Sequence, residues 1–242
     1  ELDCVEAPTP GYEGAFKTQV AGPWTLAATV EKPRGDRVLA DHGARRDLAE
    51  SLAEGLRSHI RDVRRRVPGA TSLVVQVDEP ALPAVLTGSV PTASGFGKHR
   101  VVHPPEASAL LETVLSAIAE EGAEPWVHSC APGVPWGLVR GAGATGFVVD
   151  LSVLSAADHD TVAEALEGGV SVALGVVPTL EPAGGTSDKA LVQRVERWLD
   201  MLGLDPEAGT LLVGPGCGLA GASTAWSRKA LTLSRQVAAA LS

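Results

Sequence analysis

Cysteine, methionine and aromatic residues are scarce in this 242-residue sequence, and it contains no long apolar run. Three cysteines in a chain of this length do not make the disulfide framework of a small secreted protein. No stretch reaches the ~20 apolar residues that a membrane-spanning helix requires, and no signal peptide is recognisable. These absences favour a cytoplasmic protein without a membrane partner.

An excess of positive charge is also missing. The sequence has 20 Lys and Arg against 29 Asp and Glu, and its formal net charge is -9. Negative charge repels phosphate backbones, which argues against nucleic acid as a partner. Hydrophobic residues make up 45% of the chain, enough for a sizeable core. The composition therefore fits a soluble enzyme, and we expect a single domain over residues 1–242.

The beginning of the chain is unusual for a complete protein. Residue 1 is a glutamate, and the single methionine of the sequence is Met201. We interpret the sequence as N-terminally truncated.

Short apolar segments alternate with amphipathic ones along the sequence, which predicts strands alternating with helices. We expect strands at about Phe16–Val20, Leu73–Val77, Pro125–His128, Phe147–Leu151, Ser171–Val176 and Leu211–Gly214. We expect helices at about 40–66, 106–121, 132–141, 155–168, 187–203 and 221–241. Near-continuous apolar strands separated by helices are typical of a parallel sheet.

Functional-looking residues follow the predicted strands, as in a TIM (β/α)8 barrel, whose active site lies at the C-terminal ends of the strands. Six strands are too few to close such a barrel. We therefore predict an α/β chain with about six βα units, the first two units being missing upstream. A dinucleotide-binding fold is not indicated by the GAGATG sequence at 141–146, because these glycines end a predicted helix and lead into a strand.

Two cysteines and a histidine are the most informative side chains. His128 and Cys130 stand two residues apart at a strand end, so they point to one face, and Cys217 follows a later strand. One imidazole and two thiolates suit Zn²⁺ in tetrahedral coordination. Because no fourth Cys or His is near, the pattern predicts a catalytic zinc site with an open position.

Four segments resemble the catalytic barrel of cobalamin-independent methionine synthase. They are VAGPWTL (20–26), LVVQVDEPAL (73–82), WVHSC (126–130) and GPGCGLAG (214–221). Their order and spacing match over about residues 15 to 240, and the similarity is strongest to compact relatives with one barrel. The resemblance implies a zinc-dependent S-methyltransferase of methionine biosynthesis, which moves a methyl group to the thiol of homocysteine. It also implies that His128, Cys130 and Cys217 bind zinc.

The resemblance assigns further roles. It implies that Asp78 holds the ammonium group of homocysteine, with Glu79 as a second candidate. Asp150 stands where the family usually has a glutamate ligand of zinc. Trp24 is a candidate to stack on a pterin or another flat methyl donor. The donor is expected to be methyltetrahydrofolate or methylcobalamin, the latter with a corrinoid protein as a possible partner.

Two departures from the family keep alternatives open. The Asp-x-His segment of the family is replaced by Pro178 and Thr179, which leaves no visible proton donor to the leaving group, and the family's G-S-x-P segment lies outside this sequence. A methylcobamide-dependent coenzyme M methyltransferase of the same superfamily uses a comparable set of ligands. A metal-binding barrel without catalytic activity is the third hypothesis.

Overall fold

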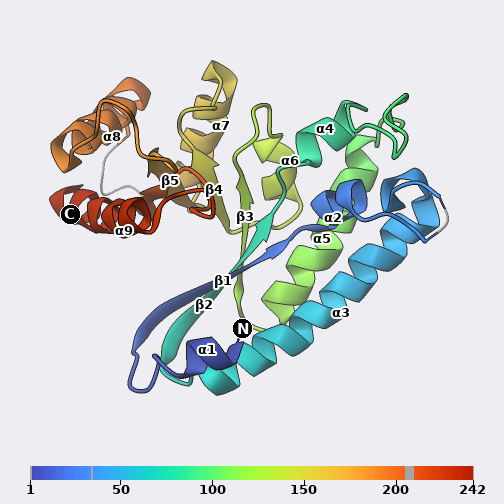
Figure 1. Cartoon of the computed structure of the whole chain (residues 1–242), viewed down its shortest axis with the longest axis horizontal. Helices are drawn as coiled ribbons and strands as arrows, with labels where there is room; N and C mark the ends of the chain where they lie inside the picture. The colour runs from blue at the N-terminus through green and yellow to red at the C-terminus, as the bar shows by residue number, and fades with distance from the viewer. Residues whose placement is uncertain (1, 34, 205–209, 242) are drawn as a thin grey trace. The chain divides into compact units, whose positions relative to one another are not determined.

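Strands and helices alternate along the chain in the computed structural model, which describes residues 2–33, 35–204 and 210–241 (Figure 1). The strands are β1 (Gly14–Ala21), β2 (Ala70–Asp78), β3 (Glu124–Ser129), β4 (Gly146–Asp150), β5 (Ser171–Val177) and β6 (Leu211–Pro215). The helices that precede β3 are α1 (Leu2–Glu6), α2 (Pro23–Thr29), the 3-10 helix η1 (Val38–Ala40), α3 (His42–Arg66), α4 (Leu82–Leu86) and α5 (Pro104–Glu120). Those that follow it are α6 (Trp136–Gly141), α7 (Ala156–Glu167), α8 (Asp188–Leu202) and α9 (Thr224–Leu241).

The chain divides into two compact units, which are described separately. The first unit comprises residues 1–127 and 137–145, and the second comprises residues 128–136 and 146–242. The border crosses β3, so the last two residues of this strand belong to the second unit. The expectation of a single barrel domain stays a prediction.

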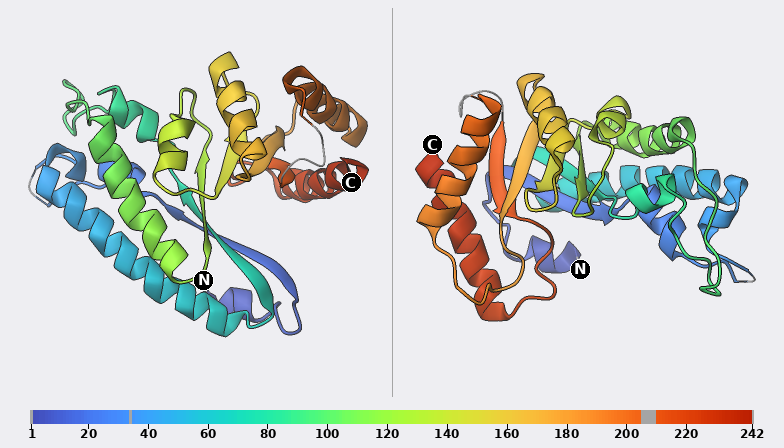
Figure 2. Two further views of the ribbon diagram at one scale, coloured as in Figure 1. Left: turned by 180° about the vertical axis from the view of Figure 1, so that it is seen from behind. Right: turned by 90° about the horizontal axis from the view of Figure 1, so that it is seen from above.

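In the first unit, β1 runs parallel to β2, and the pairing extends to Ala21 opposite Asp78. The long helix α3 lies beside α5, as Figure 1 and the left view of Figure 2 show. The Asp41 side chain caps α3 by accepting a hydrogen bond from the Ala44 N–H. Apolar residues of α3 recur at three- and four-residue intervals and form its buried stripe: Ala49, Ala53, Leu56, Ile60 and Val63.

In the second unit, β5 lies between β4 and β6 and is parallel to both. Helix α7 begins with a capping box, in which Ser155 and Asp158 each accept a hydrogen bond from the backbone of the other. Helix α8 ends at Gly203, whose φ of 65° allows the left-handed turn that stops the helix. Local sequence signals therefore mark the start of α7 and the end of α8.

All six predicted strands are confirmed, with ends that differ by at most three residues from the expected ones. Every described strand pair is parallel, which confirms the α/β class. The six predicted helices are also present, while the short helices α1, α2 and α4 were not predicted. Closure into an eight-stranded barrel stays a prediction.

The glycine-rich segment at 141–146 has the expected turn geometry. Gly141 ends α6, Gly143 has a φ of 99°, and Gly146 begins β4.

Over the described ranges, no helix combines the length and apolar character that a membrane crossing demands.

Candidate metal centre

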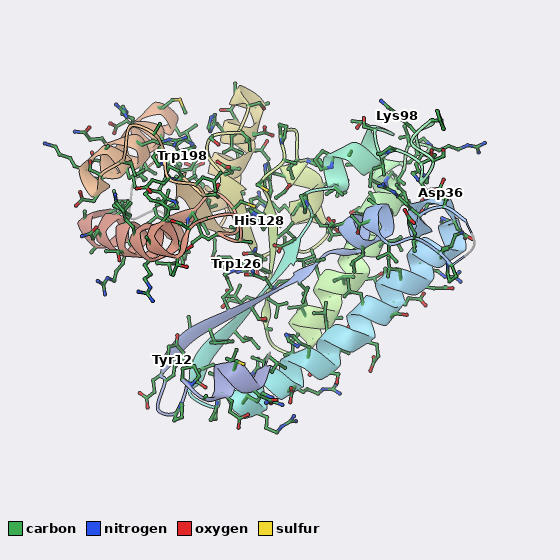
Figure 3. All side chains as sticks on the ribbon, in the orientation of Figure 1. Tyr12, Asp36, Lys98, Trp126, His128 and Trp198 are labelled. Atoms are coloured by element: carbon green, nitrogen blue, oxygen red, sulfur yellow. The ribbon has the colours of Figure 1, made fainter. Side chains whose placement is uncertain are left out.

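Three side chains of the second unit converge on one point. His128 is the second-to-last residue of β3, Cys130 follows that strand, and Cys217 lies two residues beyond β6. Figure 3 labels His128 at its place on the ribbon. The ligand atoms of the three residues all lie within 4.8 Å of one another, and within the described residues this is the one such group of three or more His, Cys, Asp or Glu. The side chains of His128 and Cys130, two residues apart at the end of β3, thus converge with Cys217 as predicted.

The imidazole of His128 is held in a defined orientation. Its Nδ1 lies 2.9 Å from the carbonyl oxygen of Val148 in β4, and only 6% of the residue is exposed. Since a carbonyl oxygen only accepts hydrogen bonds, Nδ1 carries the proton in this contact. The lone pair of Nε2 is then free for a metal, as in the usual arrangement around a histidine ligand.

The two cysteines are free thiols in direct contact. The Cys217 thiol donates a hydrogen bond to the Cys130 sulfur over 2.9 Å. Burial raises the pKa of the Cys130 thiol to about 11, and the hydrogen bond and charge of Cys217 and the charge of Asp150 act in the same direction. Two adjacent thiolates therefore need a nearby cation, and a soft set of two sulfurs and one nitrogen fits Zn²⁺.

Asp150 supports the loop that carries Cys217. Its Oδ1 accepts hydrogen bonds from the backbone N–H and the hydroxyl of Ser152, at 2.8 and 2.6 Å. A Cβ atom added to Gly216 would lie 2.8 Å from the Asp150 carboxylate, so this carboxylate packs directly on the loop backbone. Asp150 is not one of the three clustered ligands. Its predicted coordination of zinc stays a prediction.

The two carboxylates at the end of β2, in the first unit, have different surroundings. Asp78 is half-buried, and its Oδ1 accepts a hydrogen bond of 2.6 Å from the Gln76 amide. Glu79 is fully buried, and its two oxygens accept hydrogen bonds from the Trp24 N–H and from the N–H and hydroxyl of Thr25, at 2.7 to 2.8 Å. Burial raises the pKa of Glu79 to about 7. Glu79 thus anchors the start of α2 and, unlike Asp78, offers no exposed oxygen to a ligand.

Trp24 is a core residue, contrary to the interpretation that it stacks on a methyl donor. Only 1% of it is exposed, and its Nε1 donates a hydrogen bond to the carbonyl oxygen of Ala107 at 3.0 Å. Pro23 and Trp24 begin α2, so the ring follows the helix into the core. No face of the indole is open to a pterin ring.

Sequence reasoning did not identify the partners of Asp78. Gln76 receives a hydrogen bond of 2.8 Å from the Lys17 ammonium and passes one to Asp78. The Gln-x-Asp spacing was a usable signal, because residues two apart on a strand share a face. Lys17 gave no such signal, since its proximity depends on the register between β1 and β2.

A family model matches almost the whole sequence. It is described as "Cobalamin-independent synthase, Catalytic domain" and matches residues 16–240. No curated protein matches the chain. A solved structure, described as that of an uncharacterized protein, aligns with 88% of this chain and half of its own length, at 13% identity and a TM-score of 0.35. The chain thus spans half the length of that protein.

Proposed function

We propose that this chain, which belongs to the cobalamin-independent synthase family and matches its catalytic domain, transfers a methyl group to the thiol of homocysteine with the help of zinc. The product of this reaction is methionine. The observation that carries the proposal is the convergence of His128, Cys130 and Cys217. A set of three protein ligands leaves a coordination position for a substrate, as catalytic zinc sites do.

The zinc ion, when bound, supplies the chemistry that a free thiol lacks at neutral pH: it lowers the pKa of a coordinated thiol so that the reactive thiolate forms. The protein contributes the position of the ligands. The Val148 carbonyl directs the Nε2 atom of His128, and Asp150 packs on the backbone that presents Cys217. These contacts fix two of the three ligands before any substrate arrives.

Asp78 is proposed to bind the ammonium group of homocysteine. The family resemblance assigns this role, and the local structure is compatible with it. Among the described residues, the Asp78 Oδ2 atom accepts no hydrogen bond, while Oδ1 is engaged by Gln76. A half-buried carboxylate with one available oxygen is suited to a charge-assisted hydrogen bond with a primary ammonium. Glu79, whose oxygens are both engaged, is proposed to support α2 instead.

The methyl donor is proposed to be methyltetrahydrofolate or methylcobalamin, and in the second case a corrinoid protein would deliver it. Because Trp24 is buried, the donor is bound by other residues than this indole. Two alternatives are methyl transfer to coenzyme M instead of homocysteine, and metal binding without catalytic activity. An assay of methyl transfer to each acceptor distinguishes them.

Metal analysis tests whether His128, Cys130 and Cys217 bind zinc. We expect one zinc per chain in the purified protein, and loss of this zinc in Cys217→Ser and His128→Ala. Cys4→Ser is the matched control, because Cys4 is also a free cysteine but is exposed in α1. Zinc retained by both ligand variants, or lost equally in the control, would contradict the proposed centre.

A further inference from the structure

Three polar side chains form a continuous hydrogen-bonded row in the first unit. The ammonium of Lys17 donates to Gln76 Oε1 at 2.8 Å, and Gln76 Nε2 donates to Asp78 Oδ1 at 2.6 Å. The parallel register places Lys17 opposite Val74 and Gln19 opposite Gln76, so these residues share one face of the strand pair. The row follows β2 to the strand end, where Asp78 lies.

The chemistry of the two neighbours determines which way the Gln76 amide points. An ammonium group only donates hydrogen bonds, and an ionised carboxylate only accepts them. Gln76 therefore directs its oxygen toward Lys17 and its NH2 group toward Asp78. Only 5% of Gln76 is exposed, so its amide group is buried between the exposed Lys17 and the half-buried Asp78.

The hydrogen bond from Gln76 to Asp78 matters because a carboxylate without such a partner has no fixed orientation. The terminal torsion of an aspartate is broad and roughly two-fold, so its oxygens readily rotate. A short hydrogen bond from the amide fixes Oδ1 and, with it, the direction of Oδ2. Asp78 Oδ2, which accepts no hydrogen bond from the described residues, is then the oxygen that is left for a ligand.

We propose that Gln76 is a positioning residue, which holds Asp78 so that one carboxylate oxygen receives the primary ammonium of an α-amino thiol. This inference rests on the proposed function and adds a determinant of substrate choice. Lys17 supports it from the other side by fixing the amide. A thiol that lacks the amino group gains nothing from this row, so the row selects amino-acid thiols over simple thiols.

Calorimetric titration of the zinc-loaded protein tests the inference without relying on turnover. The two probes are homocysteine and 4-mercaptobutyrate, which has the thiol and carboxylate but not the amino group. We expect Gln76→Met to weaken homocysteine binding roughly tenfold, because the amide's hydrogen bond to a charged group is lost. Gln76→Glu is expected to weaken it further, since a second carboxylate then faces Asp78. Neither variant is expected to change the affinity for 4-mercaptobutyrate more than about twofold.

Gln19→Met is the matched control. Gln19 is paired in register with Gln76 and receives a hydrogen bond of 3.2 Å from Lys17, but it has no contact with Asp78 among the described residues. Its replacement should leave both affinities unchanged. Thermal unfolding of each variant checks that the fold is retained.

Each outcome has a distinct meaning. Selective loss of homocysteine binding in the Gln76 variants supports the inference. Unchanged homocysteine binding in these variants, or an equal loss for both probes, overturns it and leaves the proposed function in place. A wild-type protein that binds 4-mercaptobutyrate but not homocysteine overturns both.

Discussion

The position of Cys217 depends on two glycines whose missing side chains let backbone segments meet. A Cβ on Gly175 would lie 2.5 Å from the Gly216 Cα and 2.6 Å from the Val149 carbonyl oxygen. A Cβ on Gly216 would lie 2.8 Å from the Asp150 carboxylate. Contacts under 3.0 Å are shorter than atoms tolerate, so a larger residue at either position must displace its neighbours. The position of Cys217 therefore depends on close packing of the neighbouring backbone segments.

The first prediction concerns Gly216. Gly216→Ala should displace the loop that carries Cys217 and lower the affinity for zinc by at least about tenfold, in the range seen when groups supporting metal ligands are lost. Competition with a chromogenic chelator measures this affinity. Gly218→Ala is the control, because a Cβ on Gly218 meets no atom within 4 Å. Equal zinc affinity in the two variants would contradict the described packing.

The second prediction concerns Asp78. Asp78→Asn should leave zinc content unchanged, because Asp78 is not one of the clustered ligands. It removes the charge from a hydrogen bond typically worth about 1.5–3 kcal/mol. Homocysteine affinity should then fall roughly ten- to over a hundredfold. Substrate saturation kinetics measure the change, and an unaltered saturation curve would remove the ammonium site from this account.

At the scale of elements, hydrogen bonds connect the start of α2 to the residue that follows β2. Glu79 accepts hydrogen bonds from Trp24 and Thr25, and a Cβ on Gly22 would lie 2.4 Å from the Glu79 carboxylate. Sequence patterns did not reveal this arrangement. Helix α2 has seven residues, too few to show a helical period, and it begins at a proline that also suits a loop. The longer helices α3 and α8 were predicted because each has enough residues to show an amphipathic pattern, which becomes its buried stripe.

The third prediction follows from the burial of Glu79. Its pKa is raised from 4.5 to about 7, so between these values the folded protein holds a proton that the unfolded chain has released. The stability that this proton contributes is complete below pH 4.5 and is lost as the pH rises to about 7. The loss amounts to roughly 3 kcal/mol of unfolding free energy.

Urea unfolding from pH 4.5 to 7.5 measures this dependence. Glu79→Gln cannot release a proton at this position. The free energy of unfolding of the wild type should therefore fall by roughly 3 kcal/mol relative to that of the variant as the pH rises over this range. The variant is expected to start from a lower stability, because its NH2 group cannot accept the hydrogen bonds of α2, so the pH slope is the diagnostic quantity. Parallel pH profiles would show that Glu79 is ionised in the folded protein throughout.

At the scale of the whole molecule, the sequence predicted the order of the elements and the convergence of three side chains better than it predicted the contacts between elements. The apolar segments gave all six strands, and the two-residue spacing of His128 and Cys130 gave a shared face. Cys217 was grouped with them because it follows a later strand, and the family resemblance supported this grouping across the 87 residues that separate it from Cys130. Contacts that depend on strand register or on packing, such as that of Lys17 with Gln76, cannot be predicted from the spacing of residues along the chain.

The central proposal is that this protein transfers a methyl group to homocysteine at a zinc site. The most direct measurement offers the zinc-loaded protein homocysteine and coenzyme M in equal amounts, with methyltetrahydrofolate or methylcobalamin that carries a ¹³C-labelled methyl group. Mass spectrometry of the thiol products then identifies the acceptor. We predict labelled methionine, no labelled methyl-coenzyme M, and no product with Cys217→Ser. Label in methyl-coenzyme M alone, or in neither thiol with either donor, would contradict the account.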